Sequence, residues 1–131
     1  MILVDTSAIY ALAAQEDSVH SRAVAAMARA IEDDEELLIH SYIVSEAASL
    51  LQRRLGLAVL LAFLERMDSF TVHWLSAGDH AEAAKLLAAR GRRQLSLVDC
   101  ASFVVMRRYG ITHAFAYDGD FEREGFTLYG G

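Results

Sequence analysis

Proline is absent from the sequence, and cysteine occurs once, at Cys100. A lone cysteine cannot form an internal disulfide, and it excludes the cysteine-rich class of zinc modules. No apolar run approaches the roughly 20 residues that a membrane-spanning helix needs. The amino terminus also lacks the basic start and small-residue cleavage site of a secretory signal. We therefore expect a cytoplasmic protein without a membrane segment.

Flexible linkers and long charged tracts are lacking as well. The glycines stand singly until the final Gly130–Gly131 pair, and the one dense charged run, at residues 32–36, fits a solvated loop or helix end. Hydrophobic residues make up 54% of the 131 positions, which excludes intrinsic disorder. A chain of this length has room for one core, so we expect a single domain over residues 1–131.

Short apolar segments alternate with longer segments of helical periodicity. Such alternation predicts right-handed crossovers and an α/β fold, with a mostly parallel sheet covered by helices on both faces. The expected strands are 2–4, 37–40, 70–74, 113–117 and 126–129, and the expected helices are 7–15, 18–30 with Ser18 as N-cap, 42–55, 57–67, 77–90 and 96–109. Sites in such sheets form beyond the carboxyl ends of the strands.

Four acidic residues fall near those strand ends. Asp5 comes directly after the first strand, and Asp118 comes directly after the strand that ends at residue 117. Asp99 lies in the first turn of the helix that Ser96 opens, and Glu46 lies in the first half of the helix over 42–55. In this topology the helix starts also sit at the carboxyl edge. The four acids are therefore predicted to converge on one place.

Carboxylates gathered within a few ångströms repel one another and raise each other's pKa, so such a cluster is generally neutralised by a cation. Oxygen ligands of this kind suit Mg²⁺ or Mn²⁺. The five histidines are scattered singly and do not favour zinc. A divalent ion held by carboxylates is suited to hydrolysing phosphodiesters, which is the chemistry that the sequence predicts.

Each acid also has a purely structural explanation. Asp5 is a candidate N-cap for the following helix, and Asp99 fits the third helical position of a capping box. Glu46 falls at the edge of an apolar arc, where solvent-facing charges are common, and Asp118–Gly119 is a common turn dipeptide. These explanations do not account for the joint pattern. The helix over 97–109 is apolar nearly all round, so a buried Asp99 needs amide groups or a metal ion as its partner.

Four short segments occur in an order and at a spacing that are specific together. They are Val4-Asp5-Thr6-Ser7-Ala8, Ser45-Glu46, Leu97-Val98-Asp99-Cys100, and Ala116-Tyr117-Asp118-Gly119-Asp120-Phe121 with a following Gly125-Phe126. In this order they resemble the PIN-domain family, and within it the VapC-type toxin ribonucleases of bacterial and archaeal toxin–antitoxin pairs. The resemblance extends from residue 3 to about residue 128.

The resemblance implies a three-layer α/β/α sandwich and a Mg²⁺- or Mn²⁺-dependent endoribonuclease. The family's acidic quartet, catalytic and metal-ligating, falls on Asp5, Glu46, Asp99 and Asp118. The family's hydroxyl position falls on Thr6 or Ser7, and Asp120 takes a supporting role. The resemblance also implies an RNA substrate, a homodimer, and inhibition by a cognate antitoxin protein.

The overall charge opposes RNA binding at long range. The sequence has 12 Lys and Arg against 18 Asp and Glu, which gives a net charge of −6. Part of the excess belongs to the proposed metal ligands, where a bound cation would offset it. Among the arginines, Arg92 and Arg93 in the loop after Gly91 are the best candidates for contacting RNA phosphate.

A different class of function is a catalytically inactive PIN-like scaffold that acts as a protein- or RNA-binding module. Such a scaffold is expected to have lost one or more acids, and all four are present. Metal-dependent adhesion sites need a second serine where Ile9 stands, and haloacid-type phosphatases need an aspartate where Ser7 stands. A receiver domain needs a lysine after its last core strand, but no lysine follows Lys85.

Overall fold

The computed structural model describes residues 1–130. Its strands are β1 (Ile2–Val4), β2 (Leu37–His40), β3 (Thr71–His73), β4 (His113–Phe115) and β5 (Thr127–Leu128). Its helices are α1 (Thr6–Ala13), α2 (His20–Glu32), α3 (Ser41–Leu55), α4 (Leu57–Glu65), α5 (Ala77–Arg90), α6 (Leu97–Tyr109) and α7 (Asp120–Arg123), with a 3₁₀ turn, η1 (Met67–Ser69). Within the described residues, no helix has both the length and the apolar character needed to cross a bilayer.

The five strands form one sheet in the order β3-β2-β1-β4-β5, and every neighbouring pair is parallel. The wholly apolar β1 lies at the centre, where Leu3 pairs with Leu38 on one side and Ala114 on the other. Its three residues are at most 2% exposed, as expected for a strand covered on both faces. The predicted parallel sheet is confirmed, and all carboxyl ends therefore lie at one edge.

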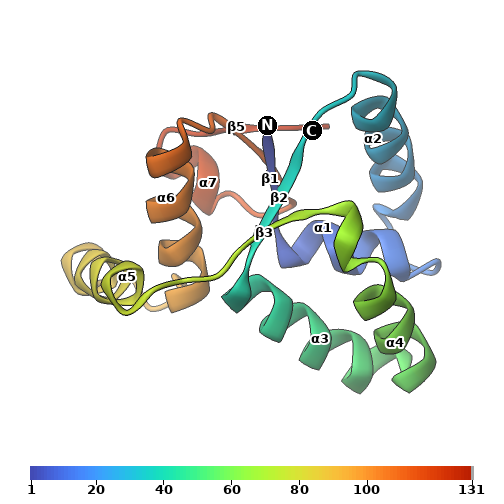
Figure 1. The fold of residues 1–131 in the computed structure, drawn as a ribbon, viewed down its shortest axis with the longest axis horizontal. Coiled ribbons are helices and arrows are strands. Elements are labelled where there is room, and N and C mark those ends of the chain that lie inside the picture. Colours follow the sequence, from blue (N-terminus) through green and yellow to red (C-terminus); the bar gives the residue numbers. More distant parts are fainter. Residues whose placement is uncertain (131) are drawn as a thin grey trace.

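Helices cover both sides of the sheet, which confirms the predicted α/β/α arrangement. Figure 1 shows α1, α2 and α4 on one side, and α5, α6 and α7 on the other. Helices α1 and α3 begin at the lower end of the sheet in this view, directly after β1 and β2. This end is the carboxyl edge of the sheet, where the acidic residues were predicted to meet.

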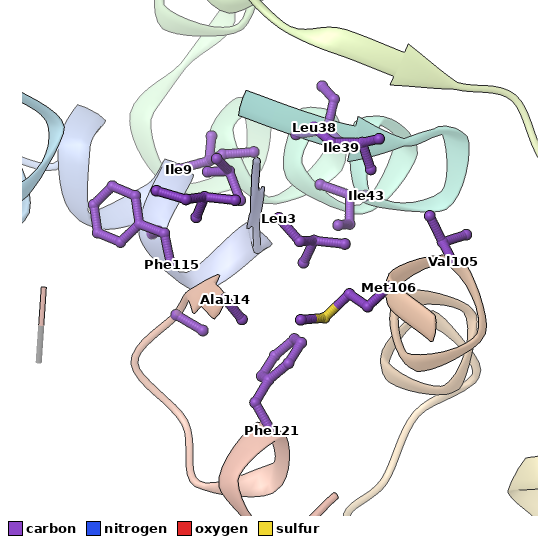
Figure 2. Close-up of a cluster of buried hydrophobic side chains, with 14 of the residues drawn as sticks. Leu3, Ile9, Leu38, Ile39, Ile43, Val105, Met106, Ala114, Phe115 and Phe121 are labelled. Atoms are coloured by element: carbon purple, nitrogen blue, oxygen red, sulfur yellow. The ribbon is translucent and has the colours of Figure 1, made fainter. Parts of the chain in front are cut away.

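The core joins the central strands to the helices on either side. Figure 2 shows Leu3, Leu38 and Ile39 of the sheet together with side chains from the surrounding helices. The helical contributors labelled there are Ile9 of α1, Ile43 of α3, Val105 and Met106 of α6, and Phe121 of α7. Six residues of α6 are buried, as its nearly continuous apolar surface predicted. This packing holds the helix that carries Asp99 firmly against the sheet.

Several element boundaries differ from those expected. The strand predicted over 113–117 ends at Phe115, because the Tyr117 amide donates to the Ser7 hydroxyl at 3.0 Å instead of to a neighbouring strand. The strand predicted over 70–74 is shortened to Thr71–His73, and the helix predicted over 57–67 ends at Glu65 before the η1 turn.

The prediction that Ser18 caps the second helix was wrong. The helix begins at His20 with Val19 at the N-cap position and no side-chain cap. The His20 ring instead forms a hydrogen bond with the carbonyl of Ala11 at 2.8 Å. The backbone amide of His20 donates to the carbonyl of Asp17. A tertiary contact to α1 therefore fixes the start of α2, which local capping preferences could not reveal.

Replacing Leu3 tests the importance of the central strand. Leu3 is fully buried, so we expect Leu3→Ala to lower the free energy of unfolding by about 2–5 kcal/mol. Leu61 on α4 is 48% exposed, and Leu61→Ala is the matched control, with an expected change within about 0.5 kcal/mol. Urea denaturation measures both values, and equal losses would contradict the assigned core.

Candidate active site

Asp5 occupies the junction between β1 and α1. It is the N-cap of α1 and is 4% exposed. Its Oδ2 accepts hydrogen bonds from the Ser7 amide at 3.2 Å and from the Ser7 hydroxyl at 2.6 Å. The same hydroxyl accepts from the Tyr117 amide at 3.0 Å. Ser7 therefore fixes the Asp5 carboxylate and joins it to the segment that leads into Asp118.

Asp99 lies at the third position of α6 in a complete capping box. The Ser96 hydroxyl accepts from the Asp99 amide at 3.0 Å, and Asp99 Oδ2 accepts from the Ser96 amide at 3.0 Å. Both bonds satisfy amides that the first turn of a helix leaves without partners. The carboxylate therefore has a fixed orientation at the beginning of the helix.

The remaining acids come from two other segments. Asp118 follows β4, and its Oδ1 accepts from the Asp120 amide at 3.1 Å, so the expected turn around Gly119 is present. Glu46 lies on α3, which begins directly after β2, and its side chain is partly exposed. The structure thus brings four separate segments of the chain to the carboxyl edge.

The pKa shifts show how closely these carboxylates act on one another. The pKa of Asp5 is raised to about 7, chiefly by burial and also by the charges of Asp118 and Asp99, while the Ser7 hydrogen bonds lower it. Burial also raises the pKa of Asp99, to which Asp120 adds, although the Ser96 bonds lower it. The set of Asp5, Glu46, Asp99, Asp118 and Asp120 is called the acidic cluster below.

Asp118 links the acidic cluster together. Burial raises its pKa, the hydrogen bond from the Asp120 amide lowers it, and the charges of Asp99, Asp120 and Glu46 raise it. The charge of Asp118 in turn raises the pKa of Asp5. Each member of the quartet therefore either raises the pKa of another member or has its own pKa raised by one.

The chemistry of the acidic cluster fits a hard divalent cation. Within residues 1–130, no hydrogen bond reaches Asp5 Oδ1, Asp99 Oδ1 or Asp118 Oδ2, so three carboxylates each keep one oxygen for a ligand. Thr6 Oγ1 is buried next to Asp5 in the chain and also has no hydrogen-bond partner there. In the described part of the chain, no group of three or more His, Cys, Asp or Glu is arranged as a finished metal site. The oxygen donors are of the kind that Mg²⁺ and Mn²⁺ prefer, and the side chains would have to move to enclose an ion.

Arg92 and Arg93 differ in their relation to the acidic cluster. Arg92 Nη2 lies 3.6 Å from Asp120 Oδ1, and its charge lowers the pKa of Asp99. Its Nε and Nη2 atoms are buried and have no hydrogen-bond partner among residues 1–130. Arg93 is exposed, and the described structure gives it no ion pair. Of these two arginines, Arg92 therefore borders the carboxylates, and Asp120 Oδ1 also accepts a hydrogen bond from Arg123 Nη1 at 3.1 Å.

A buried polar pair that the sequence analysis did not identify connects two of the helices that carry acids. His40 is fully buried at the end of β2, where its Nδ1 accepts from the Ile43 amide at 3.3 Å and caps α3. Its Nε2 therefore carries the proton and donates to Ser102 Oγ at 2.8 Å. The Ser102 hydroxyl donates to the Val98 carbonyl at 3.1 Å.

The consequence of this pair is a fixed spacing between α3, which carries Glu46, and α6, which carries Asp99. Burial lowers the pKa of His40 to about 3, so the ring stays neutral and its hydrogen bonds persist at neutral pH. A polar residue ending an apolar strand, and a serine within an otherwise apolar helix, are the signals that could have revealed it.

Comparison with known proteins identifies relatives over nearly the whole chain. A family model described as PIN domain matches residues 2–126. The chain is 34% identical over 129 residues to a Mycobacterium tuberculosis protein named 23S rRNA-specific endonuclease VapC20. That match covers 97% of this chain and 96% of the relative.

Solved structures give the same result. The crystal structure of M. tuberculosis VapC20, described as a sarcin–ricin loop cleaving toxin, matches with a TM-score of 0.85 and 31% identity over 97% of each chain. The structure of FitAcB from Neisseria gonorrhoeae matches with a TM-score of 0.69 and 16% identity, over 98% of this chain and 96% of that one. The second likeness is one of fold alone.

Asp5→Asn tests the electrostatic strain in the cluster in the absence of metal. The pKa of Asp5 is about 7 in the folded protein and near 3.8 in the unfolded chain. Between these two pH values the folded state therefore binds a proton that the unfolded state has released. Stability in chelator should therefore fall as the pH rises from about 4 to about 7. Asn keeps an oxygen for the α1 cap and carries no charge, so we expect Asp5→Asn to be more stable than the original protein at pH 8, by about 1–4 kcal/mol.

Thermal or urea unfolding in chelator at pH 4.5 and pH 8 measures this difference. The exposed Asp68 provides the control, because Asp68→Asn should leave the pH profile unchanged. A large loss of stability in Asp5→Asn at both pH values would instead identify Asp5 as a structural cap only.

Proposed function

The chain belongs to the PIN domain family, and we propose that it is a divalent-metal-dependent endoribonuclease, the toxin of a toxin–antitoxin pair. The observation that carries this proposal is the acidic cluster at the carboxyl edge of the sheet, in which Glu46 and Asp99 raise the pKa of Asp118, and Asp99 and Asp118 raise that of Asp5. The identity of 34% to a 23S rRNA-specific endonuclease supports RNA as the substrate. We propose a looped segment of ribosomal RNA as the target, as in the relative described as cleaving the sarcin–ricin loop.

Asp5, Asp99 and Asp118 would hold the ion through their unbonded oxygens, and Glu46 would complete the site directly or through water. When bound, Mg²⁺ or Mn²⁺ supplies an activated water and stabilises the attacking and leaving oxygens of the phosphodiester. Ser7 keeps the Asp5 carboxylate oriented through its hydrogen bonds. Because the pKa of Asp5 is raised to about 7, loading of the site at neutral pH should release a proton.

Arg92 has the position of a phosphate-contacting residue in this proposal. Its guanidinium borders Asp120 and Asp99, so it could pair with a phosphate that approaches the cluster. Its charge also favours the ionised form of Asp99, which is the form that binds a cation. Asp120 would act in support by holding Arg92 rather than as a main ligand.

Partners and location follow from the same proposal. We expect a cognate antitoxin protein to bind and inhibit the nuclease, and the nuclease to form a homodimer. An enzyme that cuts ribosomal RNA would work in the cytoplasm.

RNA cleavage provides the direct test of function. Protein freed of any partner is incubated with total RNA in Mg²⁺, in Mn²⁺ and in chelator, and new RNA ends are mapped. We expect discrete cuts that require the metal, and a loss of activity of at least about 100-fold in Asp99→Asn, because a ligand is weakened while the helix cap is kept. Asp68→Asn should cleave like the original protein. Folded, partner-free protein that makes no cuts under any condition would favour the inactive scaffold.

A second comparison separates the two loop arginines. Loss of a charge-assisted contact to phosphate should lower kcat/KM by about 10-fold or more in Arg92→Ala. Arg93→Ala, which alters an exposed arginine one residue away, should change it by less than about 2-fold. Initial rates on one labelled RNA measure both variants. Equal effects of the two substitutions would remove the specific role given to Arg92.

A further inference from the structure

Trp74 is the one tryptophan in the sequence. It directly follows β3, so it lies at the same carboxyl edge as the acids. Its side chain is 67% exposed. Ile31 is equally exposed at 67%, but it lies near the end of α2, which leads to the opposite edge of the sheet.

The register of the sheet places Trp74 relative to Asp5. His40 pairs with His73 across β2 and β3, and Leu3 pairs with Leu38 across β1 and β2. Continuing this register puts Asp5 level with His40 and His73, so Trp74 lies one residue beyond that row and two strands away. Neighbouring strands are about 4.8 Å apart, so the lateral separation of the two backbones is about 10 Å. One RNA loop can span that distance.

The backbone on both sides of Trp74 is held in place. The ring of His73 hydrogen-bonds Tyr109 Oη at 2.8 Å and Asp79 Oδ2 at 2.9 Å. On the other side, the Leu75 amide donates to Ser41 Oγ at 3.0 Å. The exposed ring therefore projects from a fixed segment, and little conformational entropy is lost when a flat ligand packs on it.

The charge of the protein does not favour binding of RNA through its phosphates alone. The net charge is −6, and most of the arginines are already engaged within the fold. Those in ion pairs are Arg90, Arg107, Arg108 and Arg123, and those over tyrosine rings are Arg22, Arg29 and Arg54. Phosphate contacts alone would give weak affinity for RNA, whereas stacking of bases on aromatic rings does not depend on charge.

We propose that Trp74 stacks on an unpaired base of the RNA substrate and so holds a single-stranded or looped segment next to the acidic cluster. This inference rests on the proposed ribonuclease function. Unpaired bases can turn out of a loop and pack on an aromatic side chain, which a base inside a duplex cannot do. Trp74 therefore selects loops over helical RNA.

Binding is tested with the Asp99→Asn protein, so that cleavage does not interfere. Its single tryptophan reports on Trp74 alone. A labelled RNA hairpin with an unpaired loop is titrated in, and a fully paired duplex of equal length serves as the control RNA. We expect the hairpin to quench the tryptophan fluorescence over the same concentrations at which anisotropy shows RNA binding. Hairpin binding with unchanged fluorescence would overturn the proposal.

Cleavage kinetics distinguish the role of Trp74 from the nuclease function itself. We expect Trp74→Ala to raise KM for the hairpin about 10-fold with kcat within about 2-fold, and Trp74→Phe to restore most of the loss. Ile31→Ala, the matched control at equal exposure, should behave like the original protein. A cleaving protein whose Trp74→Ala variant keeps its KM would overturn stacking while the nuclease function stands. Unchanged RNA affinity with lost binding to a co-expressed antitoxin would also overturn it and assign Trp74 to protein docking.

Discussion

Repulsion among partly buried carboxylates at one edge of the parallel sheet is the constraint to which the rest of this structure responds. Asp5, Asp99 and Asp118 are each held by amides from a helix start or a turn, which supply favourable partial charge without removing the negative charge. Burial and the remaining repulsion together raise the pKa values of Asp5, Asp99 and Asp118. A divalent cation is the group that would relieve it, and this is why a stable fold and a metal-dependent reaction can depend on the same side chains.

Capping and metal binding are compatible roles for these residues. Asp5 and Asp99 use one oxygen to cap α1 and α6, and the other oxygen accepts no hydrogen bond within residues 1–130. The capping hydrogen bonds therefore fix the orientation of each carboxylate, including its other oxygen. Helix α6 is in turn held by its buried apolar face and by the His40–Ser102 hydrogen bond, which sets its position relative to α3. The site is therefore positioned by the core rather than by flexible loops.

The sequence predicted the parallel sheet and the placement of Asp5 and Asp118, because short apolar strands followed at once by an acid are a strong local pattern. It could not predict where β4 ends, since that depends on the Tyr117 amide turning to Ser7, far away in the chain. The start of α2 depends in the same way on the contact of His20 with Ala11. Arg92 and Arg93 are indistinguishable in sequence, and only the packing of Arg92 against Asp120 separates them.

The proposed function requires that the acidic cluster bind a divalent cation between its unbonded carboxylate oxygens. The most direct measurement is a crystal structure of the protein soaked in Mn²⁺, with anomalous data that locate the ion without reference to the surrounding atoms. We expect an anomalous peak in contact with Asp5, Asp99 and Asp118. Ordered carboxylates without a peak between them, or a peak bound only elsewhere on the protein, would contradict it.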